Sequence, residues 1–211
     1  LLDRLDWRGT LEVLAFINLA LSLPLLLWVI DRQMAVLPRK ATSPDDGIVH
    51  WVLRQPAFWG LMAAFTLYYA LFSGISFHMY PLLGERGLPT ASVVMIMTLI
   101  GPAQVAGRII VAAVAERAPI RQVGIGTILA LPLAMTLLLL PLTGMATLLL
   151  FALIYGAANG IMTIIRGAAV PEMLTPRAYG AVNGLLSLLG SVCKALAPML
   201  VALVWDLSGS Y

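Results

Sequence analysis

Residues 178–204 read AYGAVNGLLSLLGSVCKALAPMLVALV, a stretch in which Lys194 is the only charged side chain. A helix needs about 20 apolar residues to cross the hydrocarbon core of a bilayer, and this stretch is long enough. Five further apolar stretches share the chain, at residues 11–30, 57–79, 91–114, 122–140 and 146–165. The sequence therefore predicts an all-α, polytopic membrane protein with six membrane-spanning helices.

The composition supports the same prediction. Of the 211 residues, 61% are hydrophobic and 11% are charged, which lies outside the range of soluble domains. Cys193 is the only cysteine, so no disulfide framework is expected. The lipid bilayer is an expected partner, and we expect no cofactor, no metal and no nucleic acid.

The distribution of Lys and Arg between alternate loops predicts the orientation in the membrane. The richer set, expected in the cytoplasm, is Arg32, Arg39, Lys40, Arg54, Arg117, Arg121, Arg166 and Arg177, and the poorer set is Arg4, Arg8 and Arg86. Residues 31–56 have the Pro, Gly and mixed charge of a flexible connector. We therefore expect an outer loop and one helix in residues 1–30, a cytoplasmic connector in 31–56, and a five-helix bundle in 57–211.

The chain ends also suggest how much of the protein is present. The chain starts without Met, and its first charged run does not resemble a signal peptide. Residues 205–211 read as a turn after which another helix could begin. The sequence is thus expected to be a fragment of a longer protein.

Polar side chains recur inside four of the six stretches at spacings of three or four residues, which places them on one face of each helix. These polar stripes are Thr66, Tyr69, Ser73, Ser76 and Tyr80; Gly101, Gln104 and Arg108; Asn159, Thr163 and Arg166; and Asn183, Ser187, Ser191 and Lys194. Stretches 11–30 and 122–140 have few interior polar residues and are expected to face lipid or to serve packing.

Lys194 lies slightly beyond the middle of its stretch, where a lysine costs about 2.5–3.5 kcal/mol on insertion scales. It either faces a cavity, which we favour, or extends to the outer interface about two to three turns away. Arg108 and Arg166 lie nearer the cytoplasmic ends, where an interfacial anchor or a structural ion pair is an equal alternative. An ionic latch of Arg108 with Glu116 and Arg117 is a further expectation.

Two glycine pairs have the small-xxx-small spacing of close helix packing. They are Gly156 with Gly160 and Gly180 with Gly184, and a hinge role is the alternative for each. His78 is expected to be a satisfied interfacial histidine, with proton handling as the alternative.

Three stretches resemble the major facilitator superfamily. They are HMYPLLGERG at residues 78–87, GPAQVAGRIIVAAVAER at 101–117 and YGAANGIMTIIRGAAVPEMLTPRAYGAVNG at 155–184. The resemblance implies a transporter of bacterial type in which the six stretches match helices six to eleven of twelve. Residues 1–30 would hold the last helix of the N-terminal half, residues 31–56 the central connector, and residues 57–211 an incomplete C-terminal half. Helices seven, eight, ten and eleven would then approach a central cavity.

The expected function is transport of a small-molecule substrate by alternating access, as part of a secondary active transporter of the bacterial inner (plasma) membrane. Because the stretch interiors carry cations and no carboxylates, a small organic anion is favoured, with export of a drug-like compound as the alternative. The expected substrate-binding residues are Lys194, Asn159, Thr163, Asn183, Ser187, Gln104, Tyr69 and Ser73. The expected cytoplasmic gate comprises Gly107, Arg108, Glu116, Arg117 and Arg166.

Enzyme and channel functions are the remaining alternatives. Ser76 and His78 are two residues apart on one helix and point to different faces, so they do not form a facing nucleophile–base pair. Two histidines and one cysteine are too few for a convincing metal site. A symmetric channel should repeat one polar ring, whereas these stripes differ. We therefore expect no enzyme activity.

Overall fold

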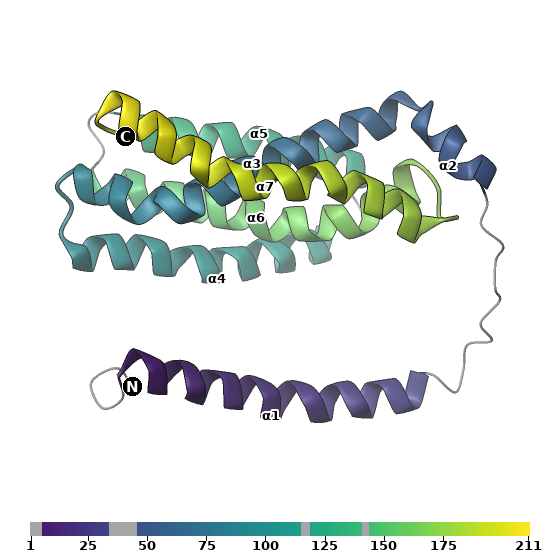
Figure 1. Ribbon diagram of the computed structural model, residues 1–211, viewed down its shortest axis with the longest axis horizontal. Helices are drawn as coiled ribbons and strands as arrows, with labels where there is room; N and C mark the ends of the chain where they lie inside the picture. The colour runs from purple at the N-terminus through teal and green to yellow at the C-terminus, as the bar shows by residue number, and fades with distance from the viewer. Residues whose placement is uncertain (1–5, 34–45, 115–118, 141–143) are drawn as a thin grey trace. The chain divides into compact units, whose positions relative to one another are not determined.

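The computed structural model describes residues 6–33, 46–114, 119–140 and 144–211, which form seven helices (Figure 1). These are α1 (Trp7–Gln33), α2 (Asp46–Leu53), α3 (Pro56–Glu85), α4 (Thr90–Val114), α5 (Ile120–Leu139), α6 (Met145–Met173) and α7 (Tyr179–Ser208). All except α2 are long and apolar enough to cross a membrane. The prediction of six spanning helices in an all-α fold is thus confirmed.

The chain divides into two units, residues 1–43 and residues 44–211. The first unit contains α1, which begins after Asp6, whose carboxylate accepts a hydrogen bond from the Gly9 amide at 2.9 Å. This contact satisfies one of the free amides of the first turn. Along α1, large apolar side chains such as Phe16 and Leu21 are exposed. A helix that is apolar all round is typical of a membrane span.

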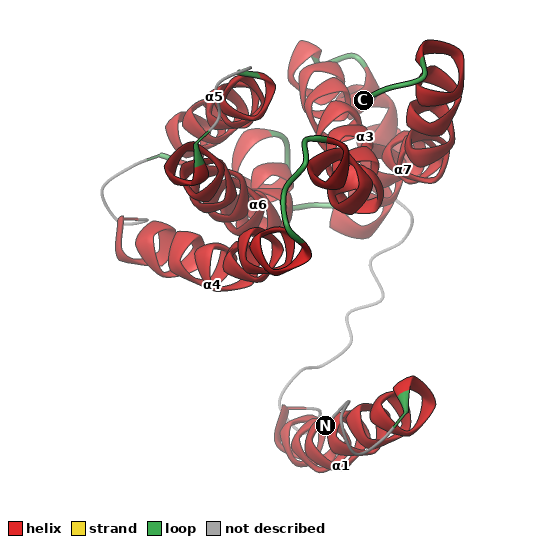
Figure 2. Ribbon diagram, turned by 90° about the vertical axis from the view of Figure 1, so that its left-hand side faces the viewer, coloured by secondary structure: helices red, strands yellow, loops and turns green. Residues whose placement is uncertain are grey.

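The second unit contains two groups of helices. Helix α3 packs along α7, whereas α4 and α5 both pack against α6 (Figure 2). Few close approaches join α3 to α6 directly. Helix α6 is the most buried of the spanning helices, and its Phe151, Tyr155 and Met162 lie in the core. It is therefore the central element of this unit.

Helices α4 and α6 approach each other through glycines. A Cβ atom at Gly160 would overlap the backbone of Gln104, and one at Gly107 would overlap the backbone of Ala157. A Cβ at Gly156 would lie 2.7 Å from the Ile100 carbonyl oxygen. The packing role expected for Gly156 and Gly160 is confirmed, because no larger residue fits at these positions.

The second glycine pair behaves differently. A Cβ atom added at Gly180 or Gly184 would meet nothing within 4 Å outside the nearby backbone of its own helix, in the part of the chain that the structure describes. Their spacing therefore does not serve helix packing among these residues. The two pairs have the same spacing, but only Gly156 and Gly160 face the backbone of a neighbouring helix.

Helix α2 lies within residues 31–56, for which the sequence predicts a flexible connector. Its Val52 side chain is fully buried within the second unit, and the Leu53 carbonyl accepts a hydrogen bond from the Trp59 indole at 2.9 Å. Gln55 is extended before Pro56, which occupies the first turn of α3. The C-terminal part of the expected connector is therefore a packed helix.

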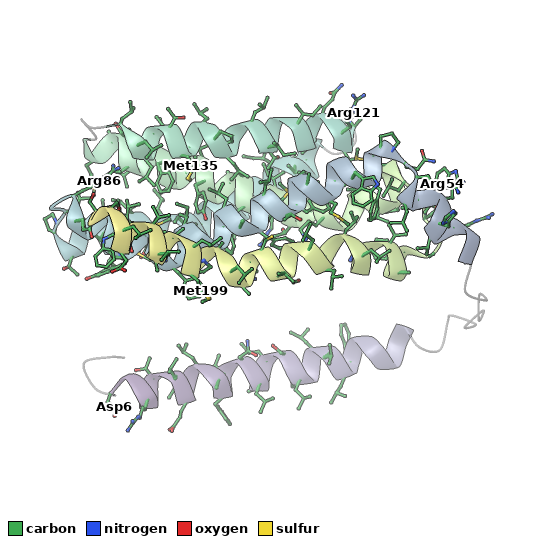
Figure 3. All side chains as sticks on the ribbon, turned by 45° about the horizontal axis from the view of Figure 1, so that its top comes forward. Asp6, Arg54, Arg86, Arg121, Met135 and Met199 are labelled. Carbon is green, nitrogen blue, oxygen red and sulfur yellow. The ribbon has the colours of Figure 1, made fainter. Side chains whose placement is uncertain are left out.

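Basic residues mark both ends of the second unit. Figure 3 shows Arg54 and Arg121 at one end and Arg86 at the other. Arg86 donates a hydrogen bond to the Leu138 carbonyl at the end of α5. Arg54 and Arg121 of the richer set thus lie at the opposite end of the second unit from Arg86 of the poorer set.

The Arg86 end also ties α3 to α7. The Trp205 indole donates to Glu85 at 2.6 Å, and the His78 Nε2 atom lies 2.9 Å from the Pro198 carbonyl oxygen. His78 Nδ1 bonds the Tyr211 hydroxyl. Both ring nitrogens of His78 therefore have partners, in agreement with the expected satisfied histidine.

Candidate substrate site

The polar stripe of α7 lies beside the face that packs on α3. Lys194 is exposed, and Asn183 and Ser187 are half-buried. Val182, Leu186 and Gly190 on the neighbouring face are buried. On the far side of α7, the exposed side chains are apolar: Leu188, Val192, Leu196, Met199 and Leu203. The exposed surface of α7 is therefore divided into a polar face and an apolar face, as expected where one side meets lipid and the other does not.

The Tyr69 side chain brings three helices together. The Arg166 guanidinium of α6 lies 4.7 Å from the centroid of the Tyr69 ring, a cation–π distance. A Cβ atom at Gly190 of α7 would lie 2.5 Å from the same ring. Ser73, one turn further along α3, is also buried. Of the predicted site residues, the structure thus joins Tyr69 and Arg166 directly.

On α6, Asn159 and Thr163 occupy neighbouring positions with different surroundings. Asn159 is only 2% exposed, and neither polar atom of its amide has a hydrogen-bond partner among the described residues. Thr163 is exposed, and its hydroxyl donates to the Gly160 carbonyl at 2.7 Å. Asn159 therefore has unused hydrogen-bonding capacity, whereas the Thr163 hydroxyl proton is already bonded within its own helix.

Helix α4 supplies the remaining predicted residues. Gln104 is half-buried with its backbone against Gly160, and Gly107 is buried against Ala157. Arg108 is exposed. The gate residues Glu116 and Arg117 fall outside the described residues. Gly107 thus has a packing contact, and the expected latch has a described position for Arg108 alone.

Two polar side chains near this site were not among the predicted site residues. The Tyr155 hydroxyl of α6 and the Thr66 hydroxyl of α3 are buried without a hydrogen-bond partner among the described residues. Tyr155 precedes Asn159 by four residues, the spacing that places both on one helix face. Extending the Asn159 stripe by one turn would have included Tyr155. A tyrosine within an apolar stretch is, however, usually interpreted as a core residue.

A separate apolar cavity of about 240 Å³ lies between α3, α5 and α6. The residues that line it include Gly60, Ala64, Arg121, Gly124, Ile128, Met162 and Ile165. A second apolar cavity of about 160 Å³ shares Ala64, Ile128 and Met162 with it. None of the predicted substrate-binding residues lines either cavity, so these cavities are distinct from the polar stripes.

Membrane-length helices that carry polar and cationic stripes on selected faces are typical of a polytopic integral membrane protein. Within the described ranges, no group of three His, Cys, Asp or Glu side chains could hold a metal ion. The family model of the Major Facilitator Superfamily matches residues 1–198, so the chain belongs to this family of membrane transporters. No curated protein and no solved structure matches the chain.

Proposed function

We propose that this chain is part of a secondary active transporter that carries a small organic anion across the bacterial inner membrane by alternating access. The observation that carries the proposal is the placement of three cations. Lys194, Arg108 and Arg166 lie on the polar stripes of α7, α4 and α6, and none of them pairs with a carboxylate in the described part of the chain. An anionic substrate supplies the charge that such residues otherwise lack.

The carboxylates of the second unit support the same choice of substrate. Glu85, Glu172 and Asp206 lie at or near helix ends, and no described residue in the interiors of α3 to α7 is acidic. A cationic substrate would find no counter-charge within these interiors. Among charged solutes, the described helices therefore favour an anion.

The predicted site residues enter the proposal with separate roles. Lys194 supplies charge, and Asn159, Gln104, Asn183, Ser187, Tyr69 and Ser73 supply polar contacts along the stripes, with Thr163 at the exposed edge. In the cytoplasmic gate, Gly107 holds α4 against α6, Arg166 rests on Tyr69, and Arg108 is the proposed partner of Glu116 and Arg117.

The proposed topology follows the resemblance. The six spanning helices correspond to helices six to eleven, residues 31–56 lie in the cytoplasm, and the remaining helices belong to the same transporter. The position of Arg54 and Arg121 at one end of the second unit supports this orientation (Figure 3).

Counterflow of labelled organic anions into proteoliposomes containing the full-length transporter tests the proposal. Lys194→Met should lower anion uptake at least about tenfold, because the charge pair with the substrate is lost, and Lys194→Arg should retain more uptake. Leu188→Met on the apolar face of α7 is the matched control and should leave uptake unchanged. Undiminished uptake by Lys194→Met would remove Lys194 from the site.

Export of an amphiphilic, drug-like compound is the second candidate function. The apolar cavity between α3, α5 and α6 favours it, since such ligands need apolar walls. Gly124→Leu should fill this cavity. If the transporter exports amphiphiles from this cavity, the substitution will reduce their efflux and leave organic-anion counterflow intact.

A further inference from the structure

The Tyr69 ring lies where α3, α6 and α7 come together. Tyr69 belongs to the polar stripe of α3 and lies near the middle of that helix. The Arg166 guanidinium, from the polar stripe of α6, lies 4.7 Å from the centre of the ring. On the α7 side, a Cβ atom at Gly190 would lie 2.5 Å from the ring. The stripes of α3 and α6 therefore meet at this ring, and α7 touches it at Gly190.

Lys194 lies one helical turn beyond the point where α7 touches the Tyr69 ring. It follows Gly190 by four residues, a rise of about 6 Å, and residues four apart share a helix face. Gly190 is buried against the ring, whereas Lys194 is exposed and carries its ammonium group on a flexible four-carbon stem. Two cationic side chains from different helices therefore belong to the surroundings of one ring.

The contact with Tyr69 places the charge of Arg166 well inside the second unit. Tyr69 follows the start of α3 at Pro56 by thirteen residues, which is about 20 Å along the helix axis. The sequence predicts a place for Arg166 in the cytoplasmic gate, but its half-buried guanidinium lies on the ring of a residue expected to bind substrate. Arg166 is therefore positioned to contact a solute as well as to hold a gate.

Neither cation has a carboxylate partner among the described residues. On α6, Glu172 is six residues from Arg166 and lies on a different face of the helix. On α7, Asp206 is twelve residues from Lys194, which is about 18 Å along the axis. Charges within a membrane are costly and are usually paired. A solute with one negative group would compensate only one of the two cations.

We propose that Arg166 and Lys194 together bind a small dicarboxylate beside the Tyr69 ring, with one carboxylate on each cation. A guanidinium bonds a carboxylate through two parallel hydrogen bonds, and an ammonium binds one as a compact point charge. The Tyr69 hydroxyl is a further donor. This inference rests on the proposed transport of organic anions and narrows their class to dicarboxylates. It also gives Arg166 a binding role in addition to its proposed place in the gate.

Uptake by the full-length transporter in proteoliposomes at pH 7 tests this two-cation site. Each dicarboxylate of three to six carbons is compared with the monocarboxylate of equal length, as succinate is with butyrate. Carboxyl groups are ionised at this pH. At least one dicarboxylate should be taken up about tenfold or more faster than its partner, because the monocarboxylate leaves one cation without a counter-charge.

Arg166→Gln then tests whether this arginine supplies the second charge. It should lower the ratio of dicarboxylate to monocarboxylate uptake several-fold or more, and Arg166→Lys, which keeps the charge, should retain more of the ratio. Lys194→Met should lower the same ratio. Arg54→Gln removes an exposed arginine at one end of the second unit (Figure 3). It is the matched control and should leave the ratio unchanged.

Stabilisation by the substrate separates binding from helix packing. The dicarboxylate that is taken up fastest should raise the melting temperature of the wild-type protein, because it binds the folded state. It should raise the melting temperature of Arg166→Gln by less. An unchanged uptake ratio in Arg166→Gln, whatever its effect on total uptake, would assign Arg166 to helix packing alone and overturn the inference.

The outcomes distinguish this inference from the proposed function. Monocarboxylates and dicarboxylates taken up equally well would overturn the two-cation site and leave anion transport standing. Failure to take up any organic anion would overturn the proposed function itself.

Discussion

The Arg166 guanidinium on α6 lies 4.7 Å from the centre of the Tyr69 ring on α3. Because α3 and α6 meet directly at few points, this contact is one of the links between the α3–α7 pair and the α4–α5–α6 group. Tyr69 also fills the space that Gly190 leaves on α7. One aromatic ring thus couples three helices.

A double-mutant cycle measures this link. Tyr69→Leu and Arg166→Met, singly and together, should give a coupling free energy of about 0.5–2 kcal/mol in thermal or denaturant unfolding in detergent. Tyr69→Phe keeps the ring face and should retain most of the coupling. A coupling energy near zero would show that the two side chains only lie side by side.

The glycines between α4 and α6 lead to a second prediction. Gly160→Ala should lower the free energy of unfolding by about 1–3 kcal/mol, because its methyl group would overlap the Gln104 backbone. Gly184→Ala is the matched control. With open space around it, it should be neutral or stabilising by up to about 1 kcal/mol. Equal melting temperatures for the two variants would contradict the close approach of the helices.

The contacts of His78 lead to a third prediction. His78→Leu removes the bond to the Pro198 carbonyl and the bond to the Tyr211 hydroxyl, and should cost about 1–2 kcal/mol of stability. His50→Leu on the exposed face of α2 is the control and should have little effect. Thermal unfolding of both variants in the same detergent provides the comparison, and a His78 variant as stable as the control would refute the prediction.

The backbone at the start of α7 provides a fourth prediction. Ala178 has a φ of 49°, in the left-handed region, and is the only described non-glycine residue with positive φ. A side chain with a Cβ costs about 1–2 kcal/mol there. Ala178→Gly should therefore raise the melting temperature, although the greater freedom of glycine in the unfolded chain offsets part of the gain. A lower melting temperature would argue against the left-handed conformation.

The spanning helices could be predicted from the sequence because the thickness of the bilayer sets the minimum length of an apolar stretch that can cross it. Their ends were less predictable. The last helix continues past Val204 to Ser208, and α3 past Met79 to Glu85. Polar and charged residues at the interface continue a helix without disturbing its backbone bonds, so hydropathy alone does not show where it stops.

Helix α2 and the buried Tyr155 hydroxyl could not be predicted in the same way. The buried Val52 of α2 acquires its partners only through tertiary packing, and the composition around it is that of a loop. Tyr155 lies among apolar residues in the sequence, and only the fold shows that its hydroxyl is buried. The polar stripes were visible in the sequence, but their depth of burial depends on which helices cover them.

The interlocked glycines of α4 and α6 also constrain movement in any transport cycle. Because the two backbones are in close contact at Gly107, Gly156 and Gly160, α4 could slide along α6 only if all three contacts broke together. We therefore expect α4 and α6 to move together as one rigid body. Rearrangement within the second unit is then expected at the boundary between the α3–α7 pair and the α4–α5–α6 group, where the contact of Arg166 with Tyr69 can break and form again without moving one backbone past another.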